Sequence, residues 1–69
     1  MQKMILLING EKTEIENGKN ISEILAFLGV ESKIFAVVVN ANLIKKEQYD
    51  SFFPNDGDSI ELLQFMGGG

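Results

Sequence analysis

The chain ends in Phe65-Met66-Gly67-Gly68-Gly69, and this end carries the group with the clearest chemical use. Glycine adds no side chain to a core and loses the most backbone freedom on folding, so a glycine run is a poor way to finish a fold. It makes a thin backbone instead, and the bare α-carboxylate of Gly69 could follow a narrow channel into another protein's active site. No charged side chain follows Glu61. The alternatives are a frayed terminus or a remnant of cloning.

Catalysis by side chains is disfavoured by the composition. The 69 residues contain no cysteine and no histidine, which removes the thiolate nucleophile, the commonest general base and the commonest metal ligands. Asp56 and Asp58 flank a glycine and are typical of a turn rather than of a metal site. Lys45 and Lys46 are typical of a solvated edge, or could steer the protein towards an acidic partner. The sequence therefore predicts a protein that is not an enzyme, with no metal site and no bound cofactor.

Charge and hydropathy restrict the partners. The formal net charge is −4 at pH 7, the wrong sign for holding a phosphate backbone, so nucleic acid is not an expected partner. Apolar runs such as Met4 to Ile8 are too short to cross a bilayer, and the N-terminus lacks the layout of a signal peptide. We expect a cytoplasmic protein without a membrane partner.

Four or five short strands are predicted around one helix, in the order β-β-α-β-(β)-β. Four are expected at Met4–Ile8, Thr13–Glu16, Phe35–Val39 and Ser59–Phe65, and Leu43-Ile44 is the optional fifth, a brief edge strand. Asn9-Gly10 accepts positive φ at both positions and predicts a tight turn after the first strand. The segment Tyr49–Phe53 is expected to be a turn or a single helical turn that Pro54 stops.

The helix is predicted from its caps and its apolar spacing. Asn20 stands three residues before Glu23, an approximate capping box, and Gly29 is suited to a left-handed C-terminal cap. Between them an apolar stripe at i, i+3, i+4 and i+7 gives the helix one buried face. The stripe consists of Ile21, Ile24, Leu25 and Leu28.

These elements predict an α+β domain in which the helix covers one face of a mixed sheet of four to five strands. The first and last strands are both rich in large apolar residues, so we expect them to be central, adjacent and parallel. Alternation places Leu6, Ile8, Ile60 and Leu62 towards the helix. It directs Ile5, Leu7, Leu63 and Phe65 to the opposite face, where no second layer remains to cover them.

An open apolar face of this kind predicts a docking surface for a partner, with Ile5, Leu7, Leu63 and Phe65 as its residues. The alternative is that a central parallel pair simply has apolar residues on both sides. We expect residues 1–65 to fold as one domain and residues 66–69 to form a flexible glycine tail.

The chain resembles a known family at landmarks along nearly its whole length. They are Leu6-Leu7-Ile8-Asn9-Gly10, Ala36-Val37-Val38-Val39-Asn40, Lys45-Lys46-Glu47-Gln48-Tyr49, the Asp56-Gly57-Asp58 turn with Ile60, and the Gly68-Gly69 end. In this order and spacing they resemble the ubiquitin-like (β-grasp) bacterial sulfur carriers, and more narrowly the carriers of the ThiS type in thiamine biosynthesis.

The resemblance implies that Gly69 is the reactive residue. In such families an E1-like enzyme uses ATP and magnesium to adenylate the C-terminal glycine, and sulfur originating from cysteine, delivered by a cysteine desulfurase or a similar enzyme, converts it to a thiocarboxylate. Thiazole synthase then takes this sulfur for the thiazole ring of thiamine. Gly68 would be threaded through the partner's channel, and Gly67 would either be threaded with it or act only as a hinge.

Three other functions share some of these features. The small subunit of molybdopterin synthase has the same fold and tail but delivers sulfur to a pterin. A ubiquitin-like modifier would be attached to lysines. A β-grasp interaction module with an accidental glycine end would bind partners without its tail, whereas a carrier would lose all activity when Gly68 and Gly69 are deleted.

Overall fold

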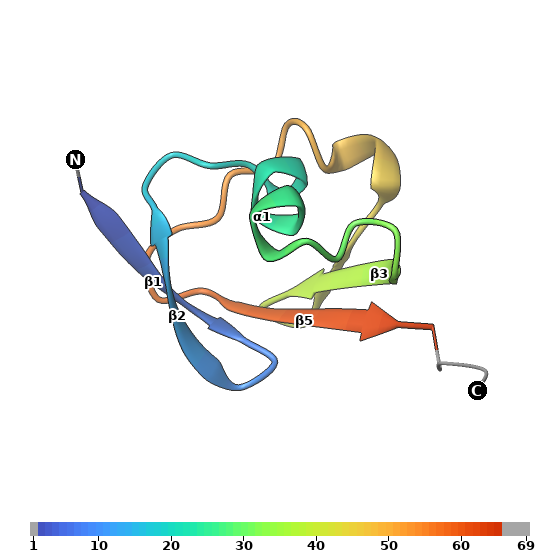
Figure 1. The fold of residues 1–69 in the computed structure, drawn as a ribbon, viewed down its shortest axis with the longest axis horizontal. Coiled ribbons are helices and arrows are strands. Elements are labelled where there is room, and N and C mark those ends of the chain that lie inside the picture. The colour runs from blue at the N-terminus through green and yellow to red at the C-terminus, as the bar shows by residue number, and fades with distance from the viewer. Residues whose placement is uncertain (1, 66–69) are drawn as a thin grey trace.

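The structure is a computed structural model and describes residues 2–65. Its five strands form one mixed sheet in the order β2-β1-β5-β3-β4, and a single α-helix lies across one face (Figure 1). The elements are β1 (Lys3–Ile8), β2 (Glu11–Glu16), α1 (Ile21–Leu28), β3 (Ile34–Val39), β4 (Asn42–Ile44), a 3₁₀ helix (Lys46–Gln48) and β5 (Ser59–Gln64). This is the predicted α+β, β-grasp architecture.

The central strand pair is parallel, as predicted. β5 lies between β1 and β3, pairing parallel with β1 and antiparallel with β3. β1 and β2 form a hairpin through Asn9 and Gly10, which have φ values of 52° and 84°. Because this turn uses only two residues, Glu11 pairs directly with Ile8 and β2 begins two residues before the predicted Thr13.

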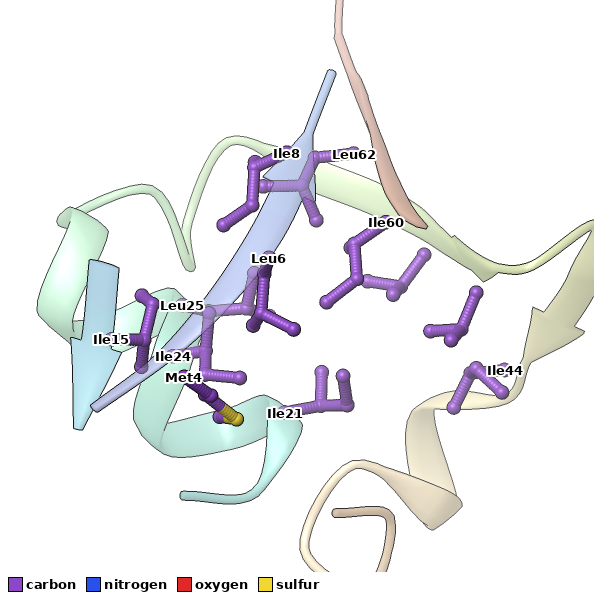
Figure 2. Packing of buried hydrophobic residues seen from close by; sticks show 12 residues of the cluster. Met4, Leu6, Ile8, Ile15, Ile21, Ile24, Leu25, Ile44, Ile60 and Leu62 are labelled. Atoms are coloured by element: carbon purple, nitrogen blue, oxygen red, sulfur yellow. The ribbon is translucent and has the colours of Figure 1, made fainter. Parts of the chain in front are cut away.

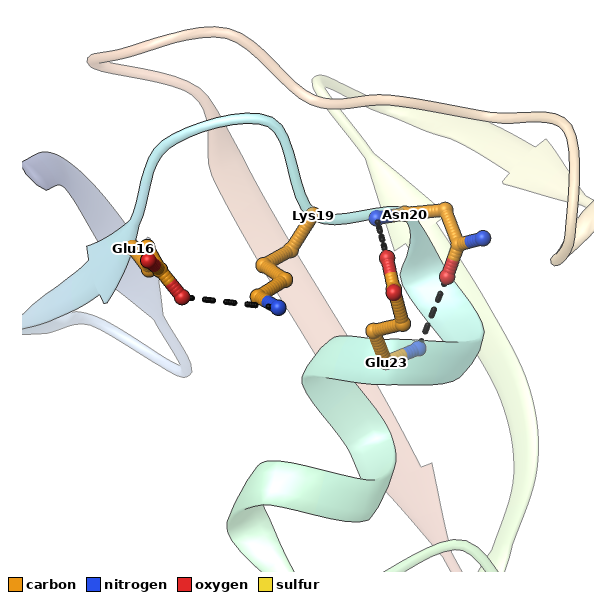
Figure 3. A network of polar contacts seen from close by, with 4 residues as sticks. All are labelled: Glu16, Lys19, Asn20 and Glu23. Carbon is orange, nitrogen blue, oxygen red and sulfur yellow. Dashed lines mark hydrogen bonds and ion pairs between the residues drawn. The ribbon is translucent and has the colours of Figure 1, made fainter. Parts of the chain in front are cut away.

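The helix has both predicted caps. The side chain of Asn20 accepts from the amide of Glu23 (2.8 Å), and a carboxylate oxygen of Glu23 accepts from the amide of Asn20 (2.9 Å), completing the capping box in Figure 3. Gly29 closes the other end at φ 71°. In the preceding loop Lys19 lies 3.4 Å from Glu16, an exposed ion pair that contributes little.

The core fills the space between α1 and the sheet (Figure 2). Its twelve buried residues are all apolar: Met4, Leu6, Ile8, Ile15, Ile21, Ile24, Leu25, Val37, Val39, Ile44, Ile60 and Leu62. The four strand residues predicted to face the helix are all among them. At this chain length one core must supply most of the stability, so each of these side chains matters.

The prediction of a turn or a single helical turn at Tyr49–Phe53 is confirmed as a turn, which lies at residues 49–51. The sequence did not predict the 3₁₀ helix that precedes it at Lys46–Gln48. The physical reason is a side-chain bond, because the Gln48 side chain accepts from the amide of Lys45 (2.9 Å) and draws the first residues into the turn. The following segment supports α1 instead, since the carbonyl of Phe52 accepts from the amide of Ile21 (3.0 Å).

The two aspartates are turn formers, as predicted. Asp58 accepts from the amide of Asn55 (2.8 Å), and Gly57 between them has a φ of 90°. Asp56 accepts from the amide of Ile5 (2.6 Å), so the turn is also fastened to β1. Both carboxylates therefore stabilise the entry into β5.

Within residues 2–65 the structure contains no helix long and apolar enough to span a membrane.

Candidate functional site

The candidate site is the C-terminal end of β5, from which the glycines depart. The predicted reactive residue Gly69 and the predicted threading residues Gly67 and Gly68 lie outside the described residues. The structure describes the chain up to Phe65 and so shows how the last strand is held and where it points. In Figure 1, β5 runs to one end of the long axis and continues past the point where β1 turns back.

Hydrogen bonds on both sides fix the first part of β5. On the β3 side the pairing runs from Val39↔Ile60 to Ile34↔Gln64. On the β1 side, Asn9 extends a short ladder, because its amide donates to the carbonyl of Ile60 (2.9 Å) and its Oδ1 accepts from the amide of Leu62 (2.8 Å). The strand is thus a rigid base for whatever follows it.

A β-bulge in β3 brings an aromatic pair to the end of β5. Ile34 pairs with Gln64 and Ala36 with Leu63, so Phe35 is an extra residue on the β3 side. The rings of Phe35 and Phe65 lie 5.1 Å apart at 47°, and both are more than half exposed, at 55% and 65%. We call Phe35, Leu63 and Phe65 the end cluster.

Sequence reasoning missed Phe35 as a member of this site. Strict alternation along the predicted strand would place it on the same side as Val37, among the core residues. The bulge breaks that alternation, and no turn residue or proline marks its position. The available signal was an aromatic residue at the start of a strand expected to lie beside the last one.

The predicted docking patch is exposed as expected, but its four residues do not form one surface. Ile5 and Leu63 are 37% and 43% exposed, Phe65 is more so, and Leu7 is half-buried. Because Leu7 pairs with Ser59, Leu63 lies four residues further along β5, about 13 Å away at about 3.3 Å per residue. Glu61 faces the same side between them.

The prediction of four adjacent residues was therefore wrong about their adjacency. Alternation fixes which face a residue points to, but the offset between two strands comes from the turns that join them. β1 ends at Ile8 and reaches only the first half of β5. Ile5 and Leu7 form one apolar site, and Leu63 and Phe65 belong to the end cluster. The role of all four in partner binding stays a prediction.

Polar side chains lie beside the end cluster on the helix side. A hollow of about 670 Å³ on the helix side is lined by residues that include Lys46, Tyr49, Phe35 and Phe65. Burial raises the pKa of the Tyr49 hydroxyl above its usual 10, so this group stays protonated and neutral at physiological pH. Among residues 2–65 no group of acidic side chains gathers in a way that could hold a metal ion.

A family comparison extends the site to the glycines. The family model described as "ThiS family" matches residues 6–69, which include the whole glycine end. The chain belongs to the ThiS family. Its predicted family and its predicted fold are both confirmed.

Two relatives match this chain over almost its full length. The sulfur carrier protein ThiS of Bacillus subtilis (strain 168) is 35% identical over 66 residues, which cover 94% of this chain and 100% of that protein. The crystal structure of the thiamine biosynthesis protein (ThiS) from Geobacter metallireducens has a TM-score of 0.77 and 31% identity, covering 96% of this chain and 100% of that one.

A third relative is a much longer protein. The thiazole synthase of Paramagnetospirillum magneticum (strain ATCC 700264 / AMB-1) is 38% identical over 66 residues. These residues cover 96% of this chain, but the chain spans only 20% of the length of the thiazole synthase. A segment of that protein therefore resembles almost the whole of this chain.

Proposed function

We propose that this protein carries sulfur on its own C-terminus, as a thiocarboxylate of Gly69. Its role is that of a sulfur carrier in thiamine biosynthesis, the role named for its full-length ThiS relatives. The observation that carries the proposal is that the family match runs through the glycines, directly beyond a central strand anchored on both sides. The partners would bind the folded residues, and the C-terminal carboxylate would be the reacting group.

The chemistry begins with activation by a partner. A carboxylate is a poor acyl donor because its leaving group is poor. An E1-like enzyme would bind ATP and magnesium, and an oxygen of the Gly69 carboxylate would attack the α-phosphorus while the bond to the β-phosphate oxygen breaks. Pyrophosphate leaves, and the glycine becomes an acyl-adenylate.

Sulfur transfer then replaces the adenylate. A sulfur nucleophile that originates from cysteine, supplied through a cysteine desulfurase or a similar enzyme, attacks the acyl carbon, and AMP leaves with the C–O electron pair. Sulfur that arrives as a persulfide forms an acyl disulfide, and a thiol reductant then breaks its S–S bond to release the thiocarboxylate. The thiocarboxylate would give its sulfur to thiazole synthase for the thiazole ring, and an oxygen from the sulfur acceptor or from water would return the glycine to a carboxylate. The need for ATP at the first step supports a cytoplasmic location.

The length of the tail suits this role. Four residues separate Phe65 from Gly69, and when extended they span at most about 13–14 Å. Ordering each of them costs roughly 1–2 kcal/mol. Burial of the exposed end cluster against a partner could offset part of this cost, at about 25 cal/mol per Å² of apolar surface.

Thiazole synthase as a partner has separate support. The thiazole synthase of Paramagnetospirillum magneticum contains a segment that resembles this chain. A carrier-like segment within that protein would keep sulfur donor and acceptor at high effective concentration. We infer no catalytic activity for the carrier itself.

Intact mass spectrometry tests the proposal. The carrier is incubated with the cognate adenylating enzyme, ATP, magnesium and a cysteine-derived sulfur source. We expect a mass increase equal to the replacement of one oxygen by one sulfur, which disappears when ATP is omitted. An unchanged mass with an adenylating enzyme that loads another carrier would overturn the proposal.

A Gly68→Ala variant tests whether the tail must be thin. The added methyl group should slow adenylation if the channel is narrow at this residue. Adenylation of this variant at the rate of the unchanged protein would exclude the steric explanation and leave the carrier role standing.

A further inference from the structure

One edge of β5 is open over its last residues. β1 pairs with β5 at Leu7↔Ser59 and Ile8↔Ile60, and the chain then turns away at Asn9. The amide and the side chain of Asn9 satisfy the carbonyl of Ile60 and the amide of Leu62. Within residues 2–65 no strand pairs with β5 on this side beyond Leu62.

The backbone amide and carbonyl of Gln64 point towards this open edge. Ile60 and Leu62 direct their amide and carbonyl groups towards β1, and Gln64, two residues further, directs its groups the same way. The next residue points to the opposite edge, because the amide of Phe65 donates to the carbonyl of Lys33 beside β3 (3.1 Å). The amide and carbonyl of Gln64 are therefore available to another strand.

An apolar hollow lies beside the same edge. It has a volume of about 480 Å³ and is lined by Phe35, Leu62, Leu63, Gln64 and Phe65. An added strand makes main-chain hydrogen bonds along an edge and places alternate side chains in pockets next to it. The open edge and the hollow thus fit one ligand, an extended peptide segment with an apolar side chain.

The two outer strands of the sheet are protected against such pairing. β2 carries four charged residues among its six, and β4 has only three residues. Charges and shortness are the usual devices that keep edge strands from pairing with other chains. The last residues of β5 have no charge, and Leu63 and the following Phe65 are exposed. Among the strand edges of residues 2–65, this one lacks such protection and is suited to a partner.

We propose that the Leu62–Gln64 edge binds an extended segment of the adenylating enzyme by strand addition, with an apolar side chain of that segment in the hollow. The identity of the partner rests on the proposed function. The glycine tail follows this edge directly, so a strand paired with Gln64 would hold the chain extended as it leaves the domain. Strand addition would align the tail with the enzyme before the glycines enter the channel.

A matched pair of substitutions at Gln64 tests the main-chain contact. Gln64→Pro removes the amide hydrogen at the open edge, and the fold loses no bond because that amide does not pair with β3. Gln64→Ala keeps the amide and removes only the side chain. We expect Gln64→Pro to raise the Kd for the cognate adenylating enzyme about tenfold or more, because the enzyme's carbonyl is left unpaired. Gln64→Ala should bind within about twofold of the unchanged protein. Equal binding by both variants would overturn the inference.

Amide hydrogen exchange gives a readout that does not depend on folding of the proline variant. The unchanged carrier is labelled with ¹⁵N, and exchange at Gln64 is measured by NMR, free and in complex with the enzyme. We expect the Gln64 amide to exchange at least about tenfold more slowly in the complex. Unchanged exchange, or no complex at all, would contradict strand addition. Protection that grows with the concentration of the carrier alone would assign the edge to a second copy and would also contradict it.

The mass measurement separates this inference from the proposed function. If the carrier gains sulfur and Gln64 gains no protection, the edge inference fails and the carrier role stands. If Gln64 becomes protected but Gly69 gains no sulfur, the edge is a binding site and the carrier role fails.

Discussion

The two halves of β5 differ although they belong to one strand. From Ser59 to Leu62 the strand has neighbours on both edges and buries Ile60 and Leu62 in the core. At Leu63 and Gln64 it has a partner on the β3 side alone, and these side chains and that of the following Phe65 are exposed. The first half holds the domain together, and the second half is free to meet another protein. In this chain of 69 residues, one segment of a strand therefore stabilises the fold, and the next segment exposes side chains that a partner could bind.

The largest effect is expected from the glycines that follow β5 in the sequence. Deleting Gly68 and Gly69 should abolish sulfur loading completely, because the new terminal carboxylate would stop short of the adenylating site. The thermal unfolding midpoint should stay within about 2 °C, since glycine has no side chain that could pack in a core. Mass spectrometry and circular dichroism measure the two effects. Sulfur loading of the shortened chain would contradict the proposal that the terminal glycines carry the sulfur chemistry and that residues 1–65 only support them.

The second prediction compares one residue from each half. Ile60 is 1% exposed and Leu63 is 43% exposed. Ile60→Ala should lower the free energy of unfolding by about 2–5 kcal/mol, because it leaves a cavity in the core. Leu63→Ala should lower it by less than about 1 kcal/mol. Urea unfolding measures both variants, and equal losses would show that the second half also supports the fold.

The third prediction decides which apolar site meets the partner. Leu63→Glu should weaken binding to the adenylating enzyme by at least about tenfold, because a charge would be buried in the contact. Ile5→Glu, in the separate Ile5–Leu7 site, is the matched variant. Calorimetric titration of both variants, with thermal unfolding as the control, separates the sites. Full binding by Leu63→Glu would exclude the end cluster as a docking surface.

The smallest effect is expected at the helix cap. Asn20→Ala removes the side-chain acceptor for the amide of Glu23 and should cost about 1 kcal/mol of folding stability. Sulfur loading at a temperature where the variant is folded should be unchanged, because α1 belongs to the body and not to the tail. A loss of sulfur loading by the folded variant would contradict the proposal that α1 contributes to stability and not to the chemistry of the C-terminus.

Much of the body could be predicted from the sequence because its signals are local. Asn9-Gly10 specified a two-residue turn, Asn20 with Glu23 specified a helix start, and alternation assigned Ile60 and Leu62 to the core. Each of these depends on backbone preferences or side-chain spacing within a few residues. The family resemblance added the function of the end, which no packing signal could have given.

The features that sequence reasoning missed are non-local. The offset of β1 against β5 separates Ile5 from Leu63, and it depends on the Asp56–Asp58 turn fastened to β1 as well as on strand alternation. The bulge at Phe35 is a property of the strand pair rather than of either strand. The 3₁₀ helix at Lys46–Gln48 depends on one hydrogen bond, in which the side chain of Gln48 accepts from the amide of Lys45. These features shape the candidate site far more than the core.

The most direct test of the account is to locate the sulfur within the loaded protein. After incubation with the cognate adenylating enzyme, ATP and a cysteine-derived sulfur source, the carrier is fragmented in tandem mass spectrometry. The account predicts that the added sulfur lies on Gly69 alone and that fragments from residues 1–65 keep their original mass. Sulfur or AMP attached to any side chain of the body, with Gly69 unmodified, would contradict it.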